Sequence, residues 1–211
     1  MSKYLDFKYI FPPRPKNASP ISDIPFWDND TMIGQPKMNG SNAVIFLNGK
    51  DSMIYNRHGN LLSNVDIDKS EVLDLYRGNG WMVLNGEYLN KNKKDENNQY
   101  FNHKLVIFDI LVYDSNYLIG DTFQSRIELL NNLYGEKNSD KYYLNGISKN
   151  VYRVKSYYSG FNEIFKDLIK IDIIEGLVMK RKNAKLEIGN TENNNTKSMI
   201  KFRKPTKNYK F

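Results

Sequence analysis

Residues 104–113 read KLVIFDILVY, and this nearly continuous apolar run predicts a β-strand that is buried on both faces. Strand-like runs over residues 42–47 and 52–57 flank Asn48-Gly49, a pair that readily takes the positive φ angles of a tight hairpin. The other predicted strands cover residues 151–155, 177–182 and 199–203, and residues 81–84 form an apolar segment that leads into Asn85-Gly86-Glu87. The central run therefore belongs to a sheet in which hairpins join neighbouring strands.

Apolar residues recur at helical spacing in two further segments. Thr122 can cap a helix that ends before Gly135, and Ser159 can cap a helix that runs to Ile169. A shorter helix is predicted over residues 70–77, and the proline-rich segment up to Pro36 is expected to wrap over a sheet in an extended or turning conformation. Hairpin-joined strands with a few helices predict an α+β fold of antiparallel β-sheets flanked by helices.

Composition limits the classes of protein to consider. A chain of 211 residues fits one domain, and a formal net charge of +7 favours a polyanionic partner such as nucleic acid. The absence of cysteine excludes disulfides, thiolate metal sites and a cysteine nucleophile. No apolar run approaches the roughly 18 residues of a membrane span, and the N-terminal residues do not read as a signal peptide. We therefore expect a cytoplasmic protein with no membrane partner.

Short motifs with chemical potential follow one another along the chain. In order, they are Lys37-Met38-Asn39-Gly40, Arg57 within YNRHG, Asn85-Gly86-Glu87-Tyr88, Phe108-Asp109-Ile110-Leu111, EGLVMK over residues 175–180 and IKFRK over residues 200–204. Each has a structural explanation when taken singly: Phe108 reads as core, and Glu87 and Glu175 read as turn residues. Their joint occurrence in this order is far more specific than any one of them.

Together these motifs resemble the covalent nucleotidyltransferase superfamily, which includes ATP-dependent DNA ligases, RNA ligases and mRNA capping enzymes. The resemblance covers roughly residues 35–205 and implies a nucleotidyltransferase (ATP-grasp-like) ligase core spanning residues 1–211 as one adenylation domain. It also implies ATP as the AMP donor, Mg²⁺ as the metal, and three steps. These are adenylation of a lysine, transfer of AMP to a 5′-phosphate, and attack by a 3′-hydroxyl that releases AMP.

The resemblance assigns roles to particular residues. Lys37 would be the nucleophile that carries AMP, assisted by Lys201 and Arg203, and Glu175 would hold Mg²⁺. Phe108 and Met179 would flank the base, and Glu87 and Arg57 would meet the ribose or a nucleic-acid phosphate. The residues implied to bind the nucleotide are Gln35, Lys37, Arg57, Glu87, Phe108, Met179, Lys180 and Lys201.

Elementary chemistry is consistent with these roles. A lysine amine attacks phosphorus only when it is neutral, so either burial or crowding by other cations has to favour the neutral form. Lys180, Lys201 and Arg203 are the cations expected to crowd it. The same cations would hold phosphate oxygens as pyrophosphate leaves. Gly40 is expected where the backbone turns beside the nucleotide and leaves no room for a Cβ.

Two departures from the family pattern leave the substrate and its clamp open. Asn39 is neutral, whereas most DNA ligases and capping enzymes have Asp at this position. The stretch KMNGSN over residues 37–42 resembles an RNA-ligase subgroup. Residues 108–133, in contrast, look more like DNA ligases. We therefore favour nicked DNA and keep nicked RNA as the alternative. No C-terminal OB domain is evident, so something else is expected to help hold the nucleic acid. One candidate is a protein partner. The other is a basic tail over residues 204–211, which contains Lys204, Lys207, Tyr209, Lys210 and Phe211. The tail reads equally well as an ordinary solvated end.

Two other functions compete with a ligase. A capping-type guanylyltransferase would use the same lysine with GTP, and a non-catalytic nucleic-acid-binding relic would keep the basic surface but lose one of Lys37, Glu87, Glu175 or Lys201. All four are present. The Asn- and Lys-rich composition suggests a minimal phage-type ligase acting in the host-cell cytoplasm.

Overall fold

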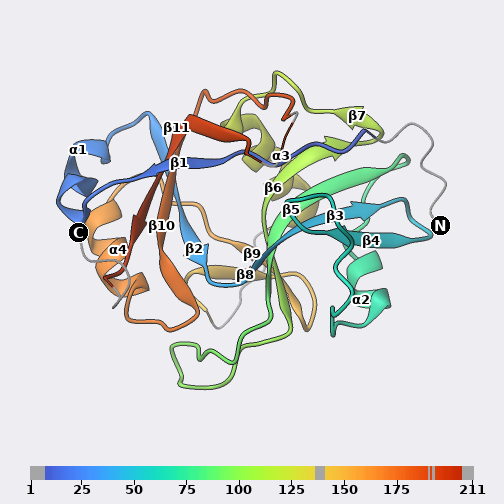
Figure 1. Ribbon diagram of the computed structural model, residues 1–211, viewed down its shortest axis with the longest axis horizontal. Coiled ribbons are helices and arrows are strands. Elements are labelled where there is room, and N and C mark those ends of the chain that lie inside the picture. Colours follow the sequence, from blue (N-terminus) through green and yellow to red (C-terminus); the bar gives the residue numbers. More distant parts are fainter. Residues whose placement is uncertain (1–7, 136–140, 190, 192, 206–211) are drawn as a thin grey trace.

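Two β-sheets face each other in the structure, a computed structural model that describes residues 8–135, 141–189, 191 and 193–205 (Figure 1). The smaller sheet has the strand order β1 (Arg14–Ala18), β11 (Asn195–Arg203), β10 (Ile174–Arg181) and β2 (Met32–Met38). The larger sheet has the order β4 (Ser52–Tyr55), β3 (Ser41–Leu47), β5 (Met82–Leu89), β6 (Lys104–Tyr113), β9 (Val151–Val154) and β8 (Leu144–Gly146), with β7 (Asn116–Tyr117) paired to β6. Because β2 passes into β3 through Asn39 and Gly40, the two sheets are joined at this corner.

Helices cover the outer faces of both sheets. α4 (Phe161–Leu168) and α1 (Ile24–Trp27), preceded by the short 3-10 helix η1 (Ile21–Asp23), lie beside the smaller sheet, and α3 (Phe123–Tyr134) packs on β6 (Figure 1). α2 (Lys69–Leu73) lies near β4. The predicted α+β fold is confirmed, with two parallel pairings, β1 with β11 and β6 with β9, among otherwise antiparallel strands.

The proline-rich N-terminal segment contains more regular structure than its composition indicated. It supplies β1 and β2, and Pro15 and Pro36 lie inside these strands. Both strands are at the ends of the smaller sheet. A proline is tolerated at a sheet edge because its missing N–H can face away from the neighbouring strand.

The hairpin between β3 and β4 forms as predicted, but its turn differs. Leu47 of β3 pairs with Ser52 of β4 at the end of the hairpin, and Asn48 takes no positive φ angle. Instead its side-chain oxygen accepts hydrogen bonds from the amides of Lys50 and Asp51, while Gly49 alone has φ of +82°. The turn therefore rests on an Asn side chain that mimics the backbone, followed by one glycine.

Helix ends show where local signals succeed and fail. Thr122 caps α3 and Gly135 ends it, as predicted. The prediction that Ser159 caps α4 is wrong, because the Asp28 carboxylate accepts hydrogen bonds from the amides of Gly160 and Phe161 at 3.2 and 3.0 Å. The helix expected over residues 70–77 is also shorter than predicted, since α2 ends at Leu73. None of the helices in the described part of the chain is long and apolar enough to cross a membrane.

Candidate active site

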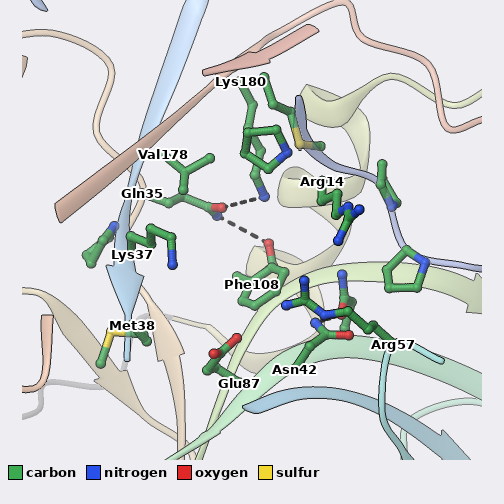
Figure 2. Close-up of a pocket in the computed structure, with 16 residues that line it drawn as sticks. Arg14, Gln35, Lys37, Met38, Asn42, Arg57, Glu87, Phe108, Val178 and Lys180 are labelled. Atoms are coloured by element: carbon green, nitrogen blue, oxygen red, sulfur yellow. Dashed lines mark hydrogen bonds between the residues drawn. The ribbon is translucent and has the colours of Figure 1, made fainter. Parts of the chain in front are cut away.

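A pocket lies between the two sheets, beside the corner where β2 meets β3 (Figure 2). Side chains from both sheets and residues 12–15 line it. The sequence-predicted residues that it brings together are Gln35, Lys37, Arg57, Glu87, Phe108 and Lys180.

Lys37 forms an ion pair with Glu175 at one side of this pocket. On β2 Lys37 is in register with Gly176 of β10, and its Nζ lies 2.5 Å from Oε2 of Glu175. Arg203 approaches the same carboxylate oxygen at 3.8 Å. Both members of the pair are partly accessible, with side chains 21% and 27% exposed. An ammonium has no lone pair, so this ion pair has to open and lose a proton before Lys37 can act as a nucleophile.

Glu87 lies across the corner from Lys37. On β5 it is in register with Asn42 of β3, and its Oε1 accepts a hydrogen bond from the amide of Gly40 at 3.1 Å. Burial raises the pKa of Glu87 to about 7, although the charges of Lys37 and Arg57 act in the opposite direction. Glu87 can therefore accept or donate a proton near neutral pH.

The neighbouring glycine packs against protein rather than leaving space for a ligand. A Cβ on Gly40 would lie 2.3 Å from the carbonyl oxygen of Tyr88. The close approach that was expected at this position is therefore to the backbone of β5. Asn39 points elsewhere, and its side-chain oxygen accepts a hydrogen bond from Lys91 at 2.9 Å.

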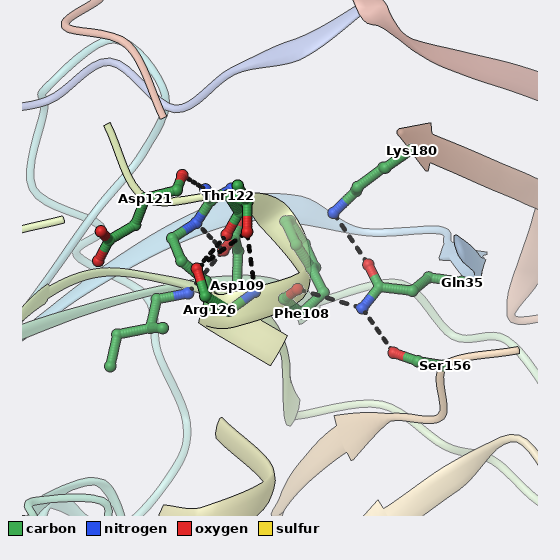
Figure 3. A network of polar contacts seen from close by, with 10 residues as sticks. Gln35, Phe108, Asp109, Asp121, Thr122, Arg126, Ser156 and Lys180 are labelled. Atoms are coloured by element: carbon green, nitrogen blue, oxygen red, sulfur yellow. Dashed lines mark hydrogen bonds and ion pairs between the residues drawn. The ribbon is translucent and has the colours of Figure 1, made fainter. Parts of the chain in front are cut away.

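Gln35, Lys180 and Phe108 form the other end of the pocket (Figure 3). The Gln35 amide donates to the carbonyl oxygen of Phe108 and to Ser156, and its oxygen accepts from Lys180 Nζ at 2.9 Å. The Lys180 ammonium also lies 5.0 Å from the Phe108 ring centroid. Burial lowers the pKa of Lys180 to about 8. This end thus presents a half-buried aromatic ring beside a fixed amide and a buried amine.

Two predicted roles do not survive the strand geometry. Lys180 is in register with Ile33, four residues along β2 from Lys37, which corresponds to about 13 Å along a strand. It therefore does not crowd Lys37. Met179 faces away from the pocket and is fully buried in the core beneath the sheet, because consecutive residues of a strand point to opposite faces. Val178 and Met199 line the pocket instead.

A basic groove adjoins the pocket. Its cationic lining residues are Arg14, Lys16, Arg57, Lys201 and Arg203. Lys201 lies on β11 in register with Val178, and burial, Arg203 and Lys37 all lower the pKa of its amine. Lys201 and Arg203 thus come close to Lys37 as predicted, whereas Arg14 was not expected from the sequence.

A buried ion pair supports the Phe108 end of the pocket from behind. Arg126 of α3 contacts both oxygens of Asp109, at 2.9 and 3.1 Å, and neither side chain is more than 2% exposed (Figure 3). Asp109 follows Phe108 on β6. The pair therefore ties α3 to the strand that presents the ring.

Gly176 lets β10 pass close to β11 beside Glu175. Its φ of +149° favours glycine, and a Cβ there would lie 1.9 Å from the carbonyl oxygen of Phe202. The pairing with β2 shifts register at this point. The irregularity places Glu175 next to Lys37, within a strand rather than in a turn.

The basic tail is only partly described. The Lys204 ammonium donates to the carbonyl oxygen of Ile171 at 3.1 Å, and its amide donates to Glu175. Lys204 thus contacts the backbone of residues 171 and 175 at the start of the predicted tail. Lys207, Tyr209, Lys210 and Phe211 lie outside the described residues.

Solved structures with a similar fold include DNA ligases. The chain is 16% identical to the ligase domain of M. tuberculosis LigD, with a TM-score of 0.59, and the match covers 82% of this chain and 53% of that chain. It is 16% identical to mycobacterial DNA ligase D complexed with ATP and MES, with a TM-score of 0.56 and coverage of 82% and 54%. It is 17% identical to a Lig E DNA ligase, with a TM-score of 0.52, and the match covers 83% of this chain and 62% of that chain. The chain therefore spans about half of the length of the solved chains it matches, and at these identities the likeness establishes the fold.

Sequence comparison identifies the family. No curated protein sequence matches the chain. The sequence profile of the family described as "ATP dependent DNA ligase domain" matches residues 70–203, which is more than half of the 211 residues. This match extends from α2 through β11 and includes Glu87, Phe108, Glu175 and Lys201. The chain therefore belongs to the ATP-dependent DNA ligase domain family.

Proposed function

We propose that this protein is an ATP-dependent polynucleotide ligase that seals breaks between a 5′-phosphate and a 3′-hydroxyl, in DNA, through AMP bound covalently to Lys37. The observation that carries the proposal is the position of Lys37. It lies between a carboxylate, Glu175, and a group of cations, in a pocket whose other end holds Phe108 and Gln35.

The first displacement would attach AMP to the protein. The Lys37 ammonium gives up a proton as its ion pair with Glu175 opens, and the Nζ lone pair attacks the α-phosphorus of ATP. A P–N bond forms, the bond from the α-phosphorus to the bridging oxygen breaks, and pyrophosphate leaves with the electron pair. Nζ then releases a second proton to solvent, which leaves a neutral P–N linkage. Lys201 and Arg203 would hold phosphate oxygens and offset this charge.

Two further displacements would seal the break. An oxygen of the 5′-phosphate attacks the α-phosphorus, the P–N bond breaks, and Lys37 recovers its electron pair and a proton. The 3′-hydroxyl oxygen of the neighbouring strand then attacks the 5′-phosphorus, loses its proton and displaces AMP. The three steps share one kind of stabilisation, which is positioned positive charge around phosphorus.

The pocket suits AMP in one orientation. The Phe108 ring, Gln35 and Lys180 would surround the base, and Glu87 would accept a hydrogen bond from a ribose hydroxyl. The phosphate would then face Lys37, Arg57 and Lys201. Support for ATP comes from the family description and from a structural relative solved with ATP.

Glu175 is the residue proposed to hold Mg²⁺. No group of three potential His, Cys, Asp or Glu ligands occurs in the described part of the chain. One carboxylate fits Mg²⁺ nevertheless, because this ion keeps several waters and is commonly bound by one or two carboxylates together with substrate phosphates. When bound, the ion would offset the negative charge of the phosphates.

An adduct assay tests the proposal. The purified protein is incubated with Mg²⁺ and α-labelled ATP or GTP and then denatured, with Lys37→Ala and Lys50→Ala compared in parallel. Lys50 is the matched control because it is exposed in the turn between β3 and β4. We expect AMP labelling of the wild type and Lys50→Ala but none of Lys37→Ala. An adduct on Lys37→Ala would contradict the proposed nucleophile, labelling by GTP alone would indicate a capping-type enzyme, and no labelling would indicate a binding protein.

The same protein preparation distinguishes the substrate. Nicked DNA and nicked RNA duplexes of identical sequence are sealed side by side. We propose DNA because of the family description. Preferential sealing of RNA would instead support the interpretation based on KMNGSN.

A further inference from the structure

The strand β1 supplies two cations, Arg14 at the side of the pocket that faces Lys37 and Lys16 in the adjoining groove. Arg14 and Lys16 are two residues apart on β1, and both line the basic groove. Arg14 and Arg57 line the pocket as well, so the groove continues directly from it. Figure 2 shows Arg14 and Arg57 across the pocket from Lys37.

Arg14 is oriented without being neutralised. Its Nε donates to Oδ1 of Asn195 at 2.9 Å, and one terminal nitrogen donates to Oδ1 of Asn193 at 2.6 Å. Both acceptors are neutral amides, so the full positive charge remains while the planar guanidinium is held in one orientation. An arginine that is pre-organised in this way loses less freedom when it binds an oxyanion.

The residues that line the groove carry a net positive charge, although Arg203 approaches the Glu175 carboxylate at 3.8 Å. None of the described residues that line it is acidic, and Arg57 makes no hydrogen bond or ion pair with the described residues. The β1 backbone also positions a third cation, since Lys201 Nζ approaches the carbonyl oxygen of Pro15 at 3.4 Å. Gathering like charges costs free energy, which a bound polyanion would recover.

Phosphoryl displacement defines what such a groove can bind. The attacking and leaving atoms lie roughly in line through phosphorus. If Lys37 attacks the α-phosphorus, pyrophosphate leaves on the opposite side. When AMP later leaves Lys37, the incoming 5′-phosphate has to approach from that same side.

We propose that Arg14 and Arg57, with Lys16, form a phosphate site across the pocket from Lys37 that holds pyrophosphate in the first displacement and the 5′-phosphate in the second. This inference rests on the proposed function for the identity of the two ligands. It adds Arg14 and Lys16 to the residues that contact substrate, and it makes Asn195 a positioning residue for Arg14. Pyrophosphate and a 5′-phosphorylated break then compete for one site.

Calorimetric titration with inorganic pyrophosphate tests the site. All titrations use the full chain with Lys37→Ala, so that no covalent step takes place and the result does not depend on catalysis. We expect Arg14→Gln to weaken pyrophosphate binding about tenfold or more, as is typical for loss of hydrogen bonds to a charged group. Asn195→Ala should weaken it severalfold, and Lys50→Gln should leave it unchanged. Equal affinity of Arg14→Gln and the parent would overturn the proposal, provided that thermal unfolding shows both to be folded.

A competition arm tests whether the site is shared. Pyrophosphate is titrated in the presence of a nicked DNA duplex that carries either a 5′-phosphate or a 5′-hydroxyl at the nick. We expect only the 5′-phosphorylated duplex to weaken pyrophosphate binding, and only when Arg14 is present. Equal competition by both duplexes, or none by either, would overturn the shared site. Failure of AMP labelling with an intact Arg14 effect would instead contradict the ligase function and leave the phosphate site standing.

Discussion

The ammonium of Lys37 on β2 lies 2.5 Å from Oε2 of Glu175 on β10, so the proposed nucleophile is paired with the carboxylate that is proposed to hold Mg²⁺. Replacing Glu175 by Gln keeps the shape but removes the negative charge that would attract the ion. We expect AMP-adduct formation to slow by about 100-fold, the lower end of the range for loss of one electrostatic stabilising group. The initial rate of labelling measures this. Glu163→Gln, at an exposed position on α4, is the control, and equal rates for both variants would assign Glu175 a structural role only.

Glu87 should make stability depend on pH. Burial raises its pKa to about 7 from an ordinary 4.5, so between these values the folded protein holds a proton that the unfolded chain has released. Stability therefore falls as pH rises from about 4.5 to 7, by roughly 2 kcal/mol. Glu87→Gln cannot ionise and should lose this component. Urea unfolding of both proteins at pH 5 and 7.5 measures the difference, and parallel pH profiles would contradict the prediction.

Removing one member of the Asp109–Arg126 ion pair should lower the free energy of unfolding far more than replacing both members by apolar residues. Asp109→Asn leaves a buried guanidinium without its counter-charge, and we expect the free energy of unfolding to fall by about 3–5 kcal/mol. Asp109→Leu combined with Arg126→Met removes both charges and should recover most of that loss. Urea denaturation of the single and double variants checks both statements. A double variant as unstable as Asp109→Asn would contradict them.

Asp28 should stabilise a helix that begins more than a hundred residues later. Its carboxylate accepts from the amides of Gly160 and Phe161 at the start of α4. We expect Asp28→Ala to lower the free energy of unfolding by about 0.5–2 kcal/mol, as for other lost N-caps. Ser159→Ala is the matched control, since Ser159 is the nearest local candidate for a cap, and it should change stability by no more than about 0.5 kcal/mol. The reverse order of effects would restore Ser159 as the cap.

Elements whose signals are local were predictable from the sequence. The bounds of β6 agree with the predicted residues 104–113, and α3 has its predicted cap and end, because a long apolar run and a Thr–Gly pair act over a few residues. β2 was missed because its proline is tolerated only at a sheet edge, and edge positions depend on the whole sheet. The Asp28 cap was missed for the same reason, since nothing near Ser159 reveals a distant carboxylate.

The candidate site was predictable as a set of residues but not as a geometry. Motif order brought together Lys37, Glu87, Phe108, Glu175 and Lys201. In the structure the first three line the pocket, Glu175 pairs with Lys37, and Lys201 lines the adjoining groove. Assigning both Met179 and Lys180 to the nucleotide ignored the alternation of a strand, a signal that was available. Arg14 left no such signal, because its place beside Asn195 arises from the parallel pairing of β1 with β11.

The smaller sheet brings distant parts of the chain together, and this has a consequence for biosynthesis. Lys37 and Glu175 are 138 residues apart, and Arg14 and Asn195 are 181 apart, whereas β3 to β6 follow one another closely. Contacts between distant residues form late because long loops have to close first. A nascent chain that ends at residue 135 can thus contain β3 to β6 and α3 but lacks β10 and β11. Attachment of AMP would therefore indicate that residues up to 203 have been synthesised and that β10 and β11 have paired with β2 and β1.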